Sequence, residues 1–285
     1  MRTANREQDL TSLLKKFSAV ELTDVGRVRD HNEDAIGGNR DAGLYVLADG
    51  MGGYNAGEVA SSIAVKTVQE FVAEAVLREN RADIETDTGL MRQTIVLRDA
   101  ISRANKVINQ TAHSQASCEG MGTTIVACLF YDNRLSIAHV GDSRLYRVRD
   151  NRLEQITLDH SLLQELVNRG FYSREEAERA TNRNYVTRAL GVEPTVQVEL
   201  QEIDVMPGDL FLLCSDGLSD MVDDEEIHLT ISTFSANLDT IGQQLIQLSN
   251  DHGGKDNVSI VLTRALEDFP ANTGILGNLK KVLGF

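Results

Sequence analysis

The sequence predicts an α+β fold in which antiparallel β-sheets pack on each other and helices cover the outside. Short strand-like segments follow one another in antiparallel runs, and long amphipathic helices come in pairs. In addition, the 285 residues contain no internal repeat, no low-complexity stretch and no clean linker. We therefore expect one domain with a small helical insertion rather than two domains.

The first half of the chain predicts two strands and two long helices. Residues 1–17 form a polar leader, and the pattern becomes strand-like at 18–26. A more apolar strand at 43–49 follows the stretch RDHNEDAIGGNR, which reads as a polar, turn-rich connection. Long amphipathic helices are then predicted at 55–79 and 90–111 because apolar residues recur with the helical period.

The second half is dominated by short strands. Residues 122–157 predict a meander of antiparallel hairpins, in which Asp132-Asn133 and Asp150-Asn151 form the turns. The other predicted elements are short helices at 161–169 and 174–180, strands at 195–203, 210–214 and 257–262, helices at 223–230 and 238–251, and a C-terminal tail at 266–285.

Composition and charge exclude several classes of protein. A net charge of −15, no Trp and only 5% aromatic residues argue against a nucleic-acid partner, because its phosphates would be repelled and its bases would find no stacking surface. Cys118, Cys128 and Cys214 are widely spaced and fit buried thiols in a reducing compartment better than disulfides or a zinc site. The polar N-terminus has no signal region, and the longest apolar stretch, 125–131, is too short to span a bilayer. We therefore expect a cytoplasmic protein with no transmembrane segment.

Aspartates recur beside strand-like runs. Asp49 in LYVLADGMGG, Asp216 in CSDGLSD and Asp256 in GGKDNVSIV each adjoin an apolar run and small residues, and Asp142 in VGDSR lies in a tight turn. Each motif alone fits an ordinary capped turn. If the fold brings the carboxylates together, they would hold Mg²⁺ or Mn²⁺, which take oxygen ligands. Gly50 would let the backbone turn so that its carbonyl binds as well.

The loop RVRDHNED supplies one basic and one acidic candidate. The guanidinium of Arg29 is a planar fork that suits two phosphate oxygens. Asp34 could orient a metal-bound water from outside the ligand set. Taken alone, the stretch is more typical of a solvated charged loop.

The motifs RxxxED, ADGMGG, GMGTT, VGDSRLY, LDHS, SDGLSD and GGKDNVSIV occur in this order from about Val20 to Leu262. Together they resemble the PPM family, the metal-dependent protein phosphatases of type 2C, in its bacterial serine/threonine form. The resemblance implies a sandwich of two antiparallel sheets flanked by pairs of antiparallel helices (α-β-β-α). It places a phosphatase domain at 18–265, with a flap at about 160–190. The implied activity is hydrolysis of phosphoserine and phosphothreonine in proteins.

The resemblance also implies a set of metal ligands. Asp49 would bridge two Mn²⁺ or Mg²⁺ ions, with the carbonyl of Gly50 on the first ion. Asp216 and Asp256 would bind the second ion. Asp142, sharing Asp216, would hold a weaker third ion.

In the implied mechanism Arg29 binds the substrate phosphate and Asp34 holds a metal-bound water. Two ions lower the pKa of a bridging water, and the resulting hydroxide attacks phosphorus in line without a covalent intermediate. Many eukaryotic members carry a proposed general acid, a His, where this chain has Met51. A metal-bound water, for example at the third ion, would then have to donate the proton, and the identity of the donor stays open. His31 and His160 lie near site segments and are interpreted as structural hydrogen-bonding residues.

Two other functions share these residues: recognition of a phosphorylated partner without turnover, and hydrolysis of a small-molecule phosphate ester. The intact ligand set favours a protein phosphatase, which would act on phosphorylated proteins and oppose a bacterial Ser/Thr kinase. We also expect the protein to be a monomer. At the C-terminus, residues 275–285 have an apolar face opposite Lys280 and Lys281. This segment is interpreted as a helix on its own domain or a frayed tail, with docking to a partner or anionic membrane as the alternative.

Overall fold

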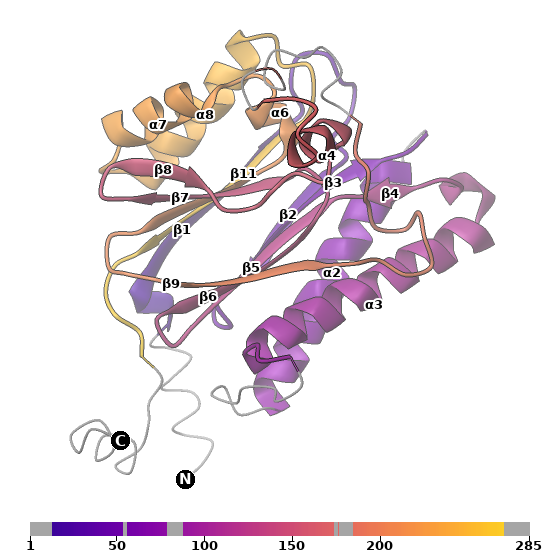
Figure 1. Ribbon diagram of the computed structural model, residues 1–285, viewed down its shortest axis with the longest axis horizontal. Coiled ribbons are helices and arrows are strands. Elements are labelled where there is room, and N and C mark those ends of the chain that lie inside the picture. Colours follow the sequence, from indigo (N-terminus) through magenta and orange to yellow (C-terminus); the bar gives the residue numbers. More distant parts are fainter. Residues whose placement is uncertain (1–12, 54–55, 79–87, 174–175, 177–184, 271–285) are drawn as a thin grey trace.

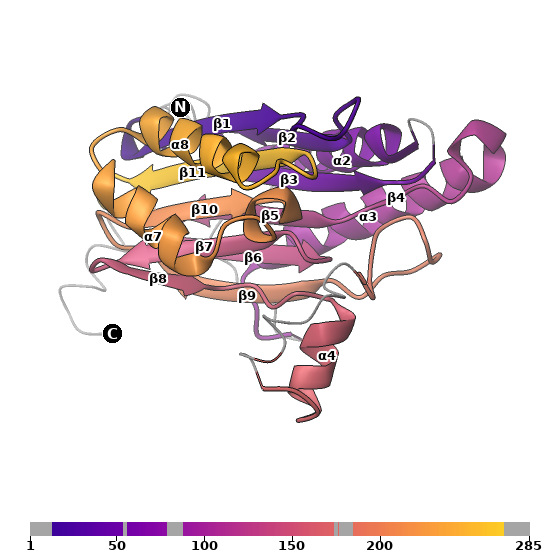
Figure 2. The ribbon, with the colours of Figure 1, turned by 90° about the horizontal axis from the view of Figure 1, so that it is seen from above.

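The computed structural model describes residues 13–53, 56–78, 88–173, 176 and 185–270. Within these residues two antiparallel sheets stack face to face, and a pair of helices covers the outside of each (Figures 1 and 2). The predicted α-β-β-α sandwich is therefore confirmed. Most of the predicted leader, most of the C-terminal tail and most of the helix expected at 174–180 lie outside the described residues.

Each sheet has a simple strand order. The first contains β1 (Phe17–Asp24), β11 (Val258–Ala265), β10 (Leu210–Cys214), β7 (Arg144–Arg149) and β8 (Arg152–Gln155). The second contains β2 (Asp34–Asn39), β3 (Leu44–Met51), β5 (Ile125–Tyr131), β6 (Arg134–Val140) and β9 (Glu199–Asp204), and the short β4 (Gly122–Thr123) pairs with the end of β3. The facing sides of the two sheets pack together through one apolar cluster, which includes Tyr45, Phe130, Phe211 and Val261.

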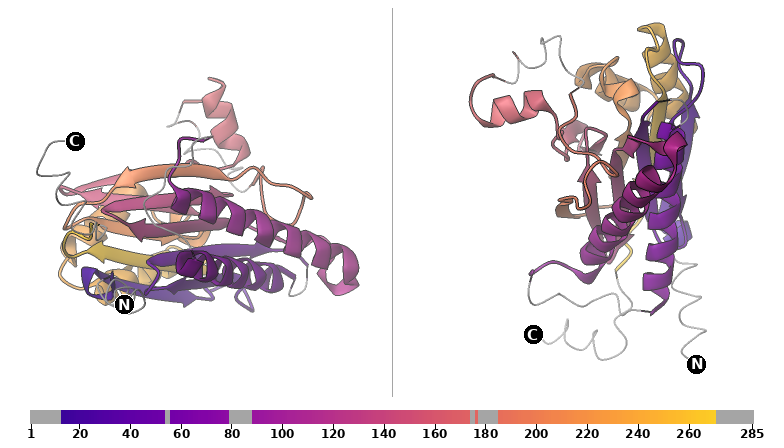
Figure 3. Two further views of the ribbon diagram at one scale, coloured as in Figure 1. Left: turned by 90° about the horizontal axis from the view of Figure 1, so that it is seen from below. Right: turned by 90° about the vertical axis from the view of Figure 1, so that its right-hand side faces the viewer.

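Helices lie on both outer faces. Those described are α2 (Ala56–Arg78) and α3 (Arg92–Ser114) on the second sheet, α7 (Asp224–Thr233) and α8 (Leu238–Asp251) on the first, the single-turn α6 (Asp216–Ser219), the 3₁₀ turn η1 (Ala116–Cys118), and α4 (Leu162–Asn168). The helix α4 belongs to the predicted flap and projects away from the sandwich (Figures 2 and 3).

Alternation along the strands divides the apolar side chains between layers. In β3, Tyr45 and Leu47 pack between the two sheets, whereas Leu44 and Val46 pack beneath α2 and α3. Because successive side chains of a strand point to opposite faces, one nearly continuous apolar run serves two cores. This explains why β3 and β5 read as fully apolar strands.

The predicted hairpin turns have the backbone that their sequences require. Asp132 and Asn133 have φ angles of 43° and 56°, and Asp150 and Asn151 have 50° and 57°. Two consecutive residues with positive φ define a type I′ turn, which matches the twist of the strands that it joins. The hairpins β5–β6 and β7–β8 are therefore specified locally.

One predicted connection is wrong. Part of RDHNEDAIGGNR forms the edge strand β2, which pairs with β3. A Cβ on Gly37 would lie 2.7 Å from Nε2 of Gln69 and 2.9 Å from Cγ1 of Val65, both on α2. The glycine lets the helix pack closely on the strand. Because glycine has a low strand propensity, the sequence pattern did not predict a strand here.

The predicted meander is also divided between the sheets. β6 pairs within the second sheet and β7 within the first, so the chain crosses between them at residues 141–143. Gly141 has a φ of 109°, which is rarely adopted by residues with a side chain. The strand predicted at 195–203 is shorter than expected and begins at Glu199.

The remaining predictions from composition concern thiols and membranes. Cys118, Cys128 and Cys214 are all buried and unpaired, as predicted. Among the residues that the structure describes, we find no helix with both the length and the apolar character needed to cross a bilayer.

Candidate metal centre

Aspartates from five segments meet at one end of the sandwich. Asp34 opens β2 and lies opposite Asp49 of β3 in the strand register. Asp216 opens α6 directly after β10, Asp256 precedes β11, and Asp142 lies where the chain crosses between the sheets. Burial raises the pKa of Asp49 well above its ordinary value, and the charges of the other four aspartates raise it further. The structure therefore brings together all five predicted carboxylates.

The other carboxylates respond in the same direction. Burial raises the pKa of Asp34 to about 7 and that of Asp142 to about 6. Burial, followed by the charges of Asp142 and Asp220, raises the pKa of Asp216 well above its ordinary value. Because these buried carboxyl groups repel one another when ionised, they cannot all carry a negative charge unless a cation offsets it. The cluster therefore favours binding of cations.

Two observations test whether a divalent cation fits. Oδ1 of Asp34 and Oδ1 of Asp216 are buried and have no hydrogen-bond partner among the described residues. Such oxygens are the ligands that Mg²⁺ and Mn²⁺ take. The N–H of Gly50 donates to the carbonyl of Glu33 (3.1 Å), and a Cβ on Gly50 would overlap the carbonyl oxygens of Glu33 and Gly57. The residues therefore fit an all-oxygen cation site.

The crowding around Gly50 leads to a prediction. Gly50→Ala should lower the free energy of unfolding by about 1–3 kcal/mol, because the new methyl group would push away the backbone of Glu33 and Gly57. It should also weaken Mn²⁺ binding. Gly53→Ala is the matched control, because a Cβ there would meet no atom of the described residues within 4 Å. Chemical denaturation and Mn²⁺ titration of both variants check this; equal effects would contradict it.

Arg29 lies at the rim of the acidic cluster. Its Nη2 donates to Oδ2 of Asp256 over 2.6 Å, while 49% of the side chain stays exposed. A guanidinium held in this way has donors left for an incoming anion. His31 is the nearest histidine in sequence, and its side chain is also half-exposed. Its Nε2 lies 3.4 Å from Oε1 of Glu33.

Asn257 holds the loop that carries Arg29, a role that the sequence pattern did not predict. Its Nδ2 donates to the carbonyls of Val25 (2.9 Å) and His31 (3.0 Å), and its Oδ1 accepts from the N–H of Glu33 (2.8 Å). One side chain therefore fixes the backbone on both sides of Arg29. The only sequence signal was its place in GGKDNV.

Other residues missed from sequence support the aspartates directly. Oγ of Ser215 donates to Oδ2 of Asp34 over 2.9 Å. The N–H of Thr124 donates to the carbonyl of Asp49 (2.8 Å), and its Oγ1 accepts from the N–H of Asp49 (3.1 Å). Asp220, the second acid of SDGLSD, is close enough to influence the pKa values of the cluster. Taken alone, the motif that contains Asp220 fitted only an ordinary capped turn.

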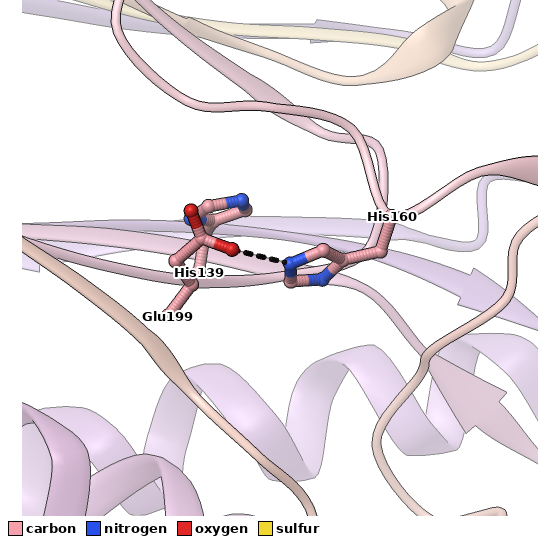
Figure 4. Close-up of side chains that lie close together, drawn as sticks. All are labelled: His139, His160 and Glu199. Atoms are coloured by element: carbon pink, nitrogen blue, oxygen red, sulfur yellow. Dashed lines mark hydrogen bonds and ion pairs between the residues drawn. The ribbon is translucent and has the colours of Figure 1, made fainter. Parts of the chain in front are cut away.

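A second polar cluster lies at the base of the flap (Figure 4). His139, His160 and Glu199 each offer a ligand atom within 4.8 Å of the others. The two rings stack with centroids 4.7 Å apart and 14° between their planes, so their in-plane lone pairs run nearly parallel. Nδ1 of His160 already accepts from the N–H of Gly141 (3.0 Å). These residues therefore fit a hydrogen-bonded support and not a metal site.

The sandwich and its acidic cluster define a metal-dependent protein phosphatase fold, and comparison with known proteins identifies the family. The sequence model described as protein phosphatase 2C matches residues 27–259. This chain belongs to that family. The resemblance stated from the motifs is confirmed.

The relatives include curated proteins and solved structures. The serine/threonine phosphatase stp of Listeria monocytogenes serovar 1/2a is 39% identical over 246 residues, which are 84% of this chain and 92% of that protein. The crystal structure of the Mycobacterium tuberculosis serine/threonine phosphatase PstP/Ppp has a TM-score of 0.77 and 37% identity, and covers 88% of this chain and 99% of its own. The catalytic domain of PstP in complex with two manganese ions has a TM-score of 0.75 and 35% identity, with the same coverage.

Proposed function

We propose that this protein is a metal-dependent phosphatase that hydrolyses phosphoserine and phosphothreonine in proteins. The observation that carries the proposal is the convergence of five aspartates, two of which have a buried oxygen without a partner among the described residues. The half-exposed guanidinium of Arg29 beside them supports an anionic substrate. The names of the Listeria and Mycobacterium relatives support the same reaction.

The proposed ligand roles are those that the resemblance to the family implies. Asp49 and the carbonyl of Gly50, with Asp216 and Asp256, would hold two Mn²⁺ or Mg²⁺ ions. The two manganese ions in the related catalytic domain support this pair. Asp142, with Asp216, would hold a weaker third ion. Burial makes the negative charge of Asp142 unfavourable, and a bound cation would offset it.

The chain's own residues prepare the reaction. What the bound ions supply is a water molecule of lowered pKa for in-line attack on phosphorus, with no covalent intermediate. Arg29 would pair with phosphoryl oxygens and offset their charge. Asp34, whose Oδ2 is occupied by Ser215, would accept a hydrogen bond from the attacking water at Oδ1. Met51 offers no proton, so solvent would protonate the leaving alkoxide.

The cellular role is a further part of the proposal. The protein would act as a monomer on proteins phosphorylated by a Ser/Thr kinase, and so oppose that kinase. The three buried free thiols support a reducing compartment such as the cytoplasm. The net charge of −15 supports protein rather than nucleic-acid substrates.

Hydrolysis of a phosphothreonine peptide, a phosphotyrosine peptide and a small phosphate ester, each with Mn²⁺, Mg²⁺ or EDTA, tests the proposal. We expect turnover of the phosphothreonine peptide that requires the metal. A preference for the small ester over both peptides would indicate a small-molecule phosphohydrolase. Tight peptide binding without turnover, with metal bound, would indicate a phosphoprotein-binding regulator.

Arg29 provides a separate prediction. Arg29→Ala should lower kcat/KM for the phosphothreonine peptide by about 10- to 100-fold, the range expected when a charge-assisted hydrogen bond to phosphate is lost. Most of the change should appear in KM. Arg27→Ala is the matched control, since it removes the same charge from an exposed position in the same loop. Equal losses in both variants would mean that only the general charge of the loop matters.

A further inference from the structure

Two hydrogen bonds join His160 to Gly141, the residue directly before Asp142. The N–H of His160 donates to the carbonyl of Gly141 (2.9 Å), and the N–H of Gly141 donates back to Nδ1 of the imidazole (3.0 Å). The ring is buried, with 7% of the residue exposed. If this acceptor were lost, the N–H of Gly141 would have no ready replacement, which is costly for a buried backbone group.

The backbone on either side of Asp142 has little freedom. A Cβ on Gly141 would lie 2.6 Å from Cβ and Cγ2 of Thr124, so the threonine side chain packs directly against the glycine. Beyond Asp142, Oγ of Ser143 is hydrogen-bonded to Oγ1 of the same Thr124 (2.7 Å). Asp142 is therefore held between two neighbours, one of which depends on His160.

The other contacts of His160 decide its tautomer. A backbone N–H can only donate, so Nδ1 is the acceptor and the ring proton is assigned to Nε2. Nε2 lies 3.0 Å from Oε2 of Glu199 (Figure 4) and 3.1 Å from Nη1 of Arg188. Burial lowers the pKa of His160, and the nearby guanidinium of Arg188 also lowers it, against the opposing effect of Glu199. The ring therefore has its Nδ1 lone pair directed at Gly141.

His160 also lies where the two ends of the flap meet. Its carbonyl accepts from the N–H of Thr187 (2.8 Å). The next residue, Ser161, forms an isolated bridge with Val186, and the N–H of Leu162 donates to the carbonyl of Tyr185 (2.9 Å). One residue thus connects the paired base of the flap to the backbone beside Asp142.

We propose that His160 is a positioning residue: its Nδ1 holds the Gly141 peptide so that the Asp142 carboxylate is aimed at the third, weaker ion site. This inference rests on the proposed role of Asp142 in that site. Residues that do not bind a metal themselves but hold a metal ligand in place affect the affinity for the metal, because they fix the orientation of that ligand. In this proposal the Nδ1 acceptor, and not the ring as a whole, determines the position of the Asp142 carboxylate.

A matched pair of variants tests this role. His160→Asn places an amide oxygen near the position of Nδ1 and keeps an acceptor for Gly141, whereas His160→Gln reaches the position of Nε2 and keeps only a donor for Glu199. Both remove the ring that stacks on His139. His160→Gln should weaken the weakest Mn²⁺ site by about tenfold or more. His160→Asn should stay close to wild type. The readout is a Mn²⁺ titration in which electron paramagnetic resonance reports the free ion.

Asp142→Asn separates failure of the inference from failure of the proposed function. If Asp142→Asn leaves every Mn²⁺ affinity unchanged, the assignment of Asp142 to a third site is wrong. If it removes the weakest site while both His160 variants behave alike, the positioning role of Nδ1 is wrong. In the Asp142→Asn background, His160→Gln should cause no further change; a further loss would indicate general structural damage.

A measurement on the wild-type protein covers the case in which a variant fails to fold. With saturating Mg²⁺, a long-range ¹H–¹⁵N spectrum should show His160 as the neutral Nε2–H tautomer. The amide hydrogen of Gly141 should be protected from exchange. The Nδ1–H tautomer, or rapid exchange at Gly141, would overturn the inference.

Discussion

Replacing Asp216 by asparagine is expected to abolish hydrolysis of a phosphothreonine peptide and to stabilise the metal-free protein. Oδ1 of Asp216 has no hydrogen-bond partner among the described residues, and Asp142, Asp220 and Asp256 surround it with like charge. An amide cannot supply the charge that a divalent ion requires, so kcat/KM should fall by at least about a hundred- to a thousandfold.

The stability of the same variant should change in the opposite direction. At pH 8 the carboxyl group of Asp216 either ionises against its neighbours or takes up a proton that the unfolded chain would not hold, and both cost free energy. Asp216→Asn removes this cost and should raise the free energy of unfolding in EDTA by more than about 1 kcal/mol.

Activity assays and chemical denaturation in EDTA check both halves of this prediction. Asp41→Asn is the control, because Asp41 is exposed and lies outside the cluster. It should change neither quantity appreciably. Activity of Asp216→Asn close to that of wild type would eliminate Asp216 as a metal ligand.

The metal-free protein should become less stable as the pH rises from about 5 to about 7, the interval between the ordinary pKa of a carboxyl group and the raised pKa of Asp34. Unfolded carboxyl groups are ionised throughout this range, since their ordinary pKa is near 4. In the folded protein, burial raises the pKa of Asp34 to about 7 and those of Asp49 and Asp216 well above their ordinary value. In this window the folded state therefore binds more protons than the unfolded chain. Stability falls by about 1.4 kcal/mol per pH unit for each carboxyl group that is protonated only in the folded state.

Saturating Mn²⁺ should remove or reverse this pH dependence, because the ion binds the ionised carboxylates and its affinity rises with pH. Denaturation curves at several pH values, with EDTA and with Mn²⁺, provide the measurement. The difference between wild type and Asp34→Asn isolates Asp34, since contributions from histidines and thiols cancel. A difference between the two proteins that does not change across the window would contradict the raised pKa of Asp34.

Much of the fold could be predicted because its signals are local. The helical period marks α2, α3 and α8, and the Asp-Asn pairs mark two type I′ turns. Strand β2 could not be predicted, because Gly37 has a low strand propensity. The glycine is needed there for close packing against α2, and this contact joins segments that are distant in sequence. The division of β6 and β7 between two sheets likewise depends on the crossing at Gly141.

The site divides in the same way. The sequence alone determined the kind of ligand, since Asp49, Asp216 and Asp256 each end or begin an apolar strand, and their motifs indicated the family. Only the tertiary structure decided which groups support them. Asn257 and His160 act through hydrogen bonds to backbone that is distant in sequence, and such bonds leave no periodic or local pattern. Burial, which raises the pKa values of the cluster, is likewise a property of the packed sheets and not of any one segment.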